Sequence, residues 1–259
     1  MAIKFLASKR VIGTNAERAD TAISPSTDED IQDETWTLSH ADITQGSSYI
    51  QWANMTGGTE AGVYDIGTAN ITDTWKLQFK ATVSSYTSGT QTQSRYCGLS
   101  LSSESSTWTG TQNSICVVFR TQATTDSFNI CTSTDEAVNG VLAGTAVSGA
   151  TLGNGTFYIT LERTSPTNAT ITVRTGSHTG TELGSASATI TSSLDELRWI
   201  KTDRLYQSAA DGNFVIKFEE IDLTTYSTVT PNIQANSVWE ASDTGVHWIL
   251  SSGTWVQVA

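Results

Sequence analysis

The stretch WKLQFKATV, residues 75–83, alternates strictly between apolar and polar side chains. An extended strand places one set on one face and the other set on the opposite face. The apolar set is Trp75, Leu77, Phe79, Ala81 and Val83. The same period of two recurs in residues 157–161, 171–173 and 214–218. These segments are therefore predicted to be β-strands, each with one buried face.

About a dozen such segments follow one another between turn sequences rich in Gly, Ser, Asn and Thr. A single sheet would leave its apolar face in water, so two sheets must pack face to face. The 43 Thr and 31 Ser residues suit the solvent side of pleated strands and disfavour helix. The predicted fold class is all-β, a two-sheet antiparallel β-sandwich of the jelly-roll type with a small C-terminal β-ribbon.

The chain divides into three predicted parts. Residues 1–33 form an N-terminal strand and a linker or assembly segment, which ends in the acidic stretch TAISPSTDEDIQDE. Residues 34–227 form the sandwich. Residues 228–259 form a three-stranded ribbon that holds Trp239, Trp248 and Trp255. A ribbon this small must pack its tryptophans on the main body, on the N-terminal segment or on another chain.

The charge distribution excludes several classes of partner. The net charge is −12 and the pI is about 4.5, whereas a nucleic-acid-binding protein needs a basic stripe. The longest apolar run, residues 116–119, is too short to span a bilayer, and the N-terminus lacks the apolar core of a signal peptide. We therefore expect no nucleic acid, no membrane insertion and synthesis in the cytoplasm without a signal peptide.

Three cysteines, Cys97, Cys116 and Cys131, are too few for a disulfide framework. All three lie in strand-like runs, where a thiol behaves as a small buried apolar group. Cys116 and Cys131 would face each other across a hairpin, so one bridge between them is the alternative.

The sequence contains no nucleophile-elbow, phosphate-loop or dinucleotide motif. Polysaccharide hydrolysis needs paired carboxylates, and the nearest candidates are Glu219, Glu220 and Asp222, with Asp195 and Glu196 as a second pair. Glu220 and Asp222 alternate, but Thr224 stands where a third alternating acid would be needed. His178 lies in a Gly-Ser turn where we expect it to be solvated, and the histidines lack metal-ligand spacing. We predict that the chain is not an enzyme and holds no metal or cofactor.

Residues 156–190 read as a strand with an aromatic start, a turn, a second strand and a hydrophilic hairpin, and NFVIKFEEIDL (213–223) reads as a late strand. This pattern resembles concanavalin A-like lectin and glucanase sandwiches, including laminin G-like modules, over about residues 34–227. The resemblance implies a concanavalin A-like sandwich.

The two ends resemble another group of proteins. MAIKFLASKRVIGTNAERAD (1–20) is similar to the start of structural proteins of tailed viruses. The final 22 residues are similar to the terminal ribbon of viral fibre and tail-associated proteins. The matching residues are Asp243, Thr244, Gly245, Trp248, Gly253, Trp255 and Val256. The alternative is an ordinary terminal hairpin.

Sugar binding needs exposed aromatic rings beside polar groups. Trp108 lies in the loop-like stretch SSTWTGT, and Tyr206 follows Asp203 and Arg204 in another. These four residues are the glycan-binding candidates. The remaining tryptophans outside the ribbon lie in alternating strands and are expected to be core or half-core; they are Trp36, Trp52, Trp75 and Trp199.

These observations predict a virion structural protein, a capsid-decorating, head-fibre or tail-associated subunit with an exposed lectin-like sandwich. Its predicted partners are copies of itself, other virion proteins and host-surface glycans. Apolar residues at the two ends are the assembly candidates, namely Ile3, Phe5, Leu6, Trp239, Trp248 and Trp255. The alternatives are a glycan-binding adhesion module outside a virion and, disfavoured by the acid pattern, a polysaccharide hydrolase.

Overall fold

The computed structural model describes most of the strands and their short connections. The described residues are 4–5, 10–13, 26–28, 31–53, 61–66, 71, 74–86, 94–105, 113–122, 125–133, 141–147, 154–191, 194, 196–203, 214–225, 238–241, 244–251 and 254–258. They contain no α-helix, and one short 3-10 helix, η1, spans Ile31–Asp33. None of the described segments is a helix with the length and apolar character needed to cross a membrane.

The chain divides into two compact units. Thr27–Thr224 form one, which we call the sandwich unit. Met1–Ser26 together with Thr225–Ala259 form the other, which we call the end unit. The N-terminal segment, one of the partner surfaces expected for the C-terminal ribbon, lies in the same unit as that ribbon.

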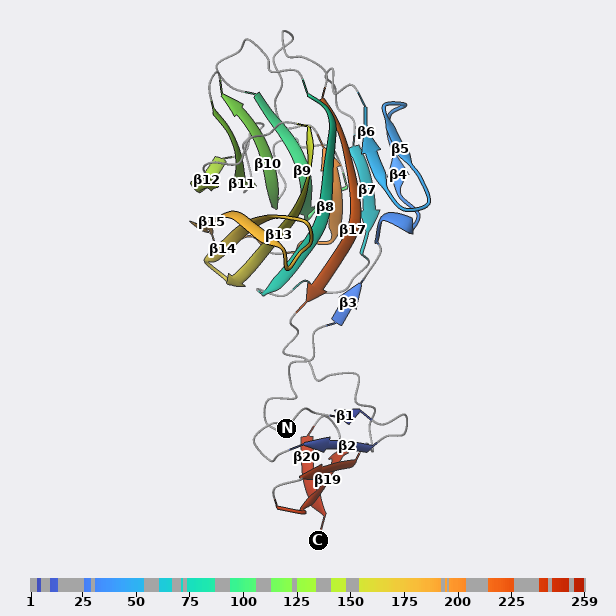
Figure 1. The fold of residues 1–259 in the computed structure, drawn as a ribbon. Coiled ribbons are helices and arrows are strands. Elements are labelled where there is room, and N and C mark those ends of the chain that lie inside the picture. Colours follow the sequence, from blue (N-terminus) through green and yellow to red (C-terminus); the bar gives the residue numbers. More distant parts are fainter. Residues whose placement is uncertain are drawn as a thin grey trace. The chain divides into compact units, whose positions relative to one another are not determined.

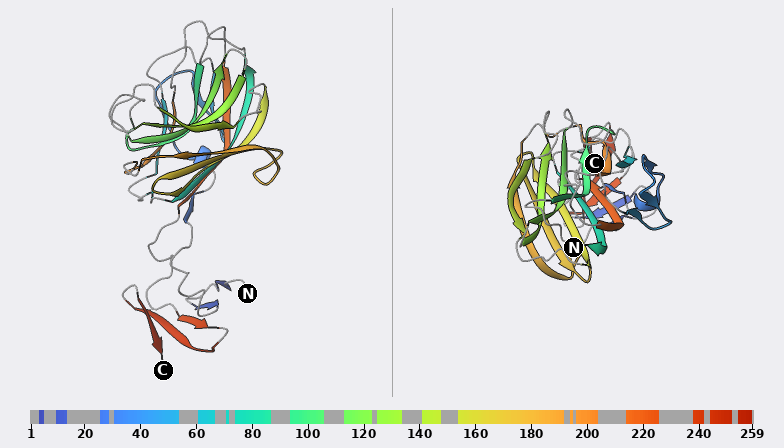
Figure 2. Two further views of the ribbon diagram at one scale, coloured as in Figure 1. Left: turned by 90° about the vertical axis from the view of Figure 1, so that its left-hand side faces the viewer. Right: turned by 90° about the horizontal axis from the view of Figure 1, so that it is seen from above.

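The sandwich unit holds two large antiparallel sheets that face each other (Figures 1 and 2). The seven-stranded sheet has the order β12 (Val141–Val147), β11 (Thr125–Ser133), β10 (Ser114–Gln122), β9 (Ser94–Ser102), β16 (Trp199–Asp203), β7 (Ala61–Asp65) and β4 (Thr37–Leu38). The eight-stranded sheet has the order β15 (Thr181–Thr189), β14 (Asn168–Thr175), β13 (Gly155–Ser165), β8 (Trp75–Tyr86), β17 (Phe214–Thr225), β6 (Ile50–Trp52) and β5 (Ile43–Gln45), with β3 (Ser26–Asp28) also paired to β17. The predicted fold class is confirmed.

The core between the two sheets follows the predicted alternation. All five apolar residues of the 75–83 stretch are at most 1% exposed and lie on the inner face of β8. Phe157 of the eight-stranded sheet stacks edge-on against Phe128 of the seven-stranded sheet, with ring centroids 5.1 Å apart. Trp36 and Trp52 are buried as predicted, and Trp199 is half-buried. Aromatic contacts across the layers thus fix the two sheets together.

The end unit is built on one five-stranded sheet. Its order is β1 (Lys4–Phe5), β2 (Arg10–Gly13), β18 (Val238–Ala241), β19 (His247–Ser251) and β20 (Thr254–Val258). The last three strands are the predicted C-terminal ribbon, which is confirmed. β2 pairs with β18 in parallel, so strands from the start of the chain extend this ribbon.

Candidate functional site

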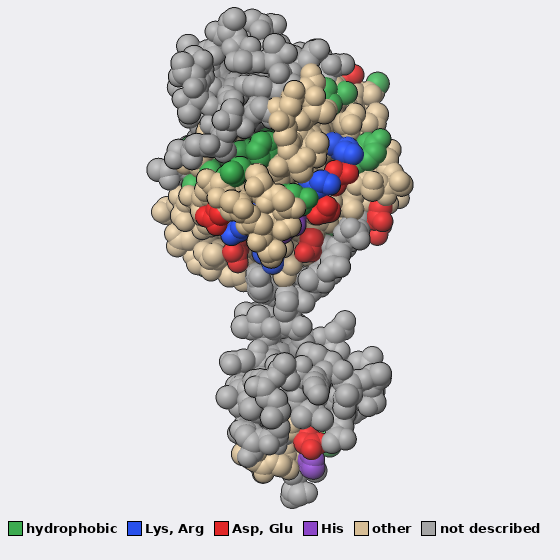
Figure 3. Space-filling view, viewed as in Figure 1, with side chains coloured by type: hydrophobic (Ala, Val, Ile, Leu, Met, Phe, Trp, Pro, Cys, Tyr) green, Lys and Arg blue, Asp and Glu red, His purple; other side chains and the backbone are tan. Residues whose placement is uncertain are grey.

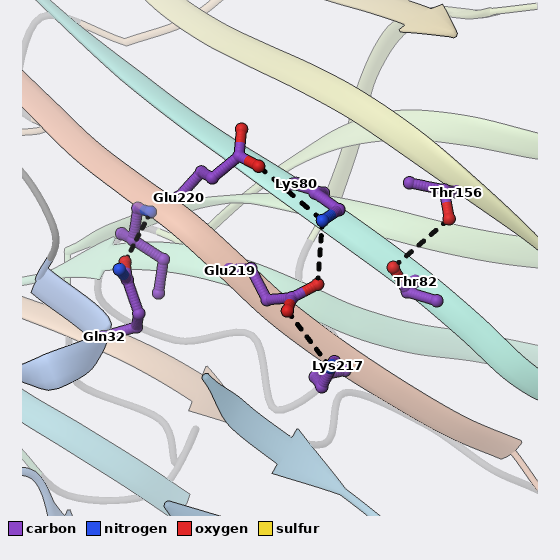
Figure 4. Close-up of polar contacts among 8 residues, drawn as sticks. Gln32, Lys80, Thr82, Thr156, Lys217, Glu219 and Glu220 are labelled. Atoms are coloured by element: carbon purple, nitrogen blue, oxygen red, sulfur yellow. Dashed lines mark hydrogen bonds and ion pairs between the residues drawn. The ribbon is translucent and has the colours of Figure 1, made fainter. Parts of the chain in front are cut away.

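The outer face of the eight-stranded sheet carries a group of charged side chains that we call the charged row: Lys80, Lys217, Glu219 and Glu220. Lys80 comes from β8 and the other three come from β17 (Figure 4). Lys80 Nζ lies 3.2 Å from a Glu219 carboxylate oxygen and 3.6 Å from a Glu220 oxygen. Lys217 Nζ lies 3.0 Å from the other Glu219 oxygen. Glu219 is therefore held by two ammonium groups.

These contacts change the acid–base properties of the row. Burial alone would lower the pKa of Lys80, but the hydrogen bond and charge of Glu219, with the charge of Glu220, raise that pKa above its usual value. Burial alone would raise the pKa of Glu219, but the hydrogen bonds from Lys217 and Lys80 lower it. Both groups are thus kept ionised at neutral pH.

A backbone irregularity explains why two consecutive glutamates reach the same surface. In a regular strand Glu219 and Glu220 would point to opposite faces. Glu220 has a φ of 50°, a left-handed conformation that is uncommon outside glycine. The Gln32 side chain of η1 accepts a hydrogen bond of 2.7 Å from the Ile221 backbone N–H (Figure 4). Ile221 then returns to the core at 0% exposure.

Aromatic side chains lie at both ends of the charged row. Lys217 Nζ lies 4.7 Å from the ring centroid of Tyr49, a cation–π contact. Tyr158 of β13 is directly opposite Lys80 in the sheet register, and His178 packs edge-on against its ring at 5.2 Å. Between these aromatic rings, acidic and basic side chains lie next to one another on this face (Figure 3).

His178 differs from its predicted state. It is half-buried against Tyr158 rather than solvated, and neither ring nitrogen has a hydrogen-bond partner among the described residues. Burial lowers its pKa, and Lys76 and Arg174 lower it further, against an opposing effect of Glu220. The sequence placed His178 in a turn correctly but gave no sign that this turn folds back over β13.

The outer face of the seven-stranded sheet is different in character. Alternation places Ser100 of β9, Cys116 of β10, Cys131 of β11 and Lys201 of β16 on this face, and each is 0% exposed. The register places Lys201 opposite Ser100 and Ser100 opposite Cys116. All four side chains are buried, including the polar Ser100 and Lys201. Burying a polar side chain costs free energy unless that side chain is hydrogen-bonded.

Most of the predicted glycan-binding residues lie outside the described part of the chain. This applies to Trp108, Arg204 and Tyr206. Asp203 is the last residue of β16, where its backbone is paired with Ala61, but its side chain is not described. The prediction for these four residues therefore stays a prediction. The sequence singled out Glu219 and Glu220 but not their contact with Lys80, because Lys80 lies on β8, more than a hundred residues earlier in the chain.

The assembly candidates are partly described. Phe5 pairs with Val11 in β1 and β2, and Trp239 is opposite Trp248 in β18 and β19. Trp255 is opposite Leu250, and only the Trp248 side chain, which is half-buried, is described among the three tryptophans. Ile3 and Leu6 lie outside the described residues. In the described residues, no group of three or more His, Cys, Asp and Glu side chains is arranged to hold a metal ion.

No protein-family model matches the chain, and no curated protein matches it. Solved structures with a similar fold include the lectin UEA-II complexed with galactose, at 10% identity and a TM-score of 0.47, covering 78% of this chain and 98% of the lectin. They also include a carbohydrate esterase from the Shiga toxin-encoding bacteriophage phi24B, at 12% identity and a TM-score of 0.46, covering 79% of this chain and 100% of the esterase. An alginate lyase from Klebsiella pneumoniae matches at 12% identity and a TM-score of 0.42, covering 74% of this chain and 84% of the lyase.

The two antiparallel sheets of this chain are similar to the β-sandwiches of these solved structures. The prediction that the chain is not an enzyme is contradicted by these similar structures, which include a carbohydrate esterase and an alginate lyase. At these identities and scores, each ligand or reaction belongs to the protein in which it was found and is not transferred to this chain.

Proposed function

We propose that this protein is a surface subunit of a tailed-virus particle, in which the end unit mediates assembly and the sandwich unit contacts glycans. The observation that supports the assembly role is the incomplete burial of the end unit. Each described apolar side chain there is at best half-buried: Val238, Val246, Trp248 and Ile249 are half-buried and Val256 is 52% exposed.

This pattern is informative because apolar side chains gain free energy when they leave water, by about 25 cal/mol for each Å² buried. The sandwich unit already buries its apolar side chains in its own core, whereas the described apolar side chains of the end unit still have exposed area. Contact with further copies of the chain or with another virion protein would bury it. The viral part of the proposal rests on the resemblance of the two ends to virion proteins.

The glycan part of the proposal has two candidate surfaces. One is the predicted loop surface with Trp108, Asp203, Arg204 and Tyr206. The other is the charged row, where Lys80 can donate hydrogen bonds, the carboxylates can accept them, and the Glu220 side chain is 51% exposed. Sugar hydroxyls require donors and acceptors of this kind, and the aromatic rings beside them offer an apolar surface.

Glycan-array binding of the full chain tests this part. We expect binding to a defined glycan set, and a loss of about tenfold in affinity for Trp108→Ala if the loop surface is used. Glu220→Gln should cause the loss instead if the charged row is used, while Glu182→Gln, on an exposed ion pair of the same sheet, serves as the matched control. Absence of binding to every glycan at high protein concentration would remove the glycan role and leave the assembly role to be tested separately.

A further inference from the structure

Two cysteine side chains lie directly opposite each other on neighbouring strands of the seven-stranded sheet. Cys116 of β10 and Cys131 of β11 are partners in the antiparallel register, with Val117 opposite Ile130 as the next pair. Both are thiols, and both are 0% exposed. Ile115 and Val117 belong to the core, so Cys116 points to the outer face, and directly opposite residues of an antiparallel pair share a face.

This placement meets the geometric requirement for a disulfide. Directly opposite residues in antiparallel strands have Cα atoms about 4.5 or 5.5 Å apart, depending on the kind of pair. Both values lie within the range of about 4.4–6.8 Å that disulfides span. The Cβ atoms of such pairs are about 4.5–5.5 Å apart, whereas a disulfide needs about 3.8 Å. A small approach of the two strands would therefore close the bond.

The third cysteine is less well placed. Cys97 of β9 is opposite Val118, and the register of β9 and β10 shifts between Cys116 and Val118. Cys116 is therefore paired directly with Ser100 on that side, and not with Cys97. Cys97 and Cys131 are separated by a whole intervening strand, which is about 9.6 Å at the usual strand spacing. The register thus selects a single pair.

We propose that Cys116 and Cys131 form a reversible dithiol–disulfide pair that is closed by small disulfides such as oxidised glutathione. One cysteine thiolate attacks a sulfur of the oxidant and releases one molecule of reduced glutathione. The second cysteine thiolate then attacks the mixed disulfide on the protein and releases the second molecule. The two cysteines lose two protons and two electrons, and one oxidised glutathione becomes two reduced molecules.

The position of the pair determines its behaviour. The bond would join β10 to β11 and enclose residues 117–130 in a covalent loop, which restricts the unfolded chain. Because both thiols are withdrawn from solvent, exchange requires the hairpin to open, so closure and reduction are slow. A reducing cytoplasm keeps such a pair as thiols, and oxidising surroundings close it.

Peptide mapping of the full chain tests the proposal. The protein is incubated with oxidised glutathione, quenched in acid, alkylated and digested with trypsin and chymotrypsin, because chymotrypsin cuts between Cys97 and Cys116 at Leu99 and Leu101. We expect one cross-linked species joining the Cys116 and Cys131 peptides, an intact mass lower by two hydrogens, and an unfolding midpoint at higher urea concentration. Dithiothreitol should reverse all three changes.

Two variants sharpen the result. Cys97→Ser should retain the cross-link and the shift in midpoint, whereas Cys131→Ser should lose both. If a variant fails to fold, peptide mapping of the protein without substitutions still shows which cysteines are cross-linked. A cross-link that contains Cys97, or Cys116 and Cys131 recovered fully alkylated after prolonged oxidation, would overturn the proposal.

Discussion

The sandwich unit and the end unit bury their apolar side chains to very different degrees. Trp75 and Phe79 of the sandwich are 0% exposed, whereas Val256 of the end unit is 52% exposed and Trp248 is half-buried. Both units are built from β-strands, so the type of secondary structure does not cause the difference. The sandwich has two sheets that cover each other, and the end unit has one. A single sheet needs another surface to complete its burial.

Phe79→Ala should produce the largest effect, a loss in the stability of the sandwich unit. Its ring contacts Phe218 in an edge-on pair with centroids 5.9 Å apart, and its removal would leave a cavity in a closed core. We expect a loss of about 3–5 kcal/mol in the free energy of unfolding, measured by urea denaturation. Ile249→Ala, at a half-buried position of the end unit, is the matched control, with an expected loss of about 1 kcal/mol or less. Equal losses in the two variants would contradict the difference in burial.

Glu219→Gln tests how much the charged row adds to a unit that already has a complete core. Since the Glu219 carboxylate is 16% exposed and contacts two lysines, we expect a loss of about 1 kcal/mol at neutral pH. The pKa of Glu219 lies below its ordinary value of 4.5 in the folded state, so its contribution is present above pH 4.5 and is lost as the pH falls through the folded pKa.

Urea denaturation at neutral and acidic pH measures this effect. The difference between Glu219→Gln and the original protein should shrink as the pH falls below 4.5. Glu182→Gln removes an exposed ion pair with Arg174 and should change stability by less than about 0.5 kcal/mol. A pH-independent loss in Glu219→Gln would show that packing, rather than charge, explains the contribution.

Substitution of His178, which lies on the outer face of the sandwich unit, should give the smallest change in stability. Its folded pKa lies below 6.5, so the unfolded chain takes up the proton at higher pH and folded stability falls as the pH drops below 6.5. His178→Phe should lose this part of the pH dependence in thermal unfolding. An NMR titration of the His178 ring with its midpoint at or above 6.5 would contradict the assigned burial against Tyr158.

Local alternation predicted much of the fold, and non-local contacts explain what it missed. The alternation of residues 75–83 was enough to predict strand β8 and its buried face, because this alternation is a local property of the sequence. A regular strand of period two would put Glu219 and Glu220 on opposite faces, whereas both carboxylates contact Lys80. Next to the irregularity at Glu220, the Ile221 backbone N–H donates a hydrogen bond to Gln32, a residue 189 positions before Ile221. Likewise, nothing in either end segment indicates the parallel pairing of β2 with β18.

Light scattering most directly tests the claim that the end unit is the assembly unit. The measurement compares the full chain with residues 27–224, which form the sandwich unit, and with Val256→Asp, which places a charge at the exposed position of β20. We predict a defined oligomer for the full chain and a monomer for residues 27–224, with Val256→Asp shifted toward the monomer. A full chain that is monomeric at all concentrations, or a shortened chain that keeps the same oligomer, would contradict the account.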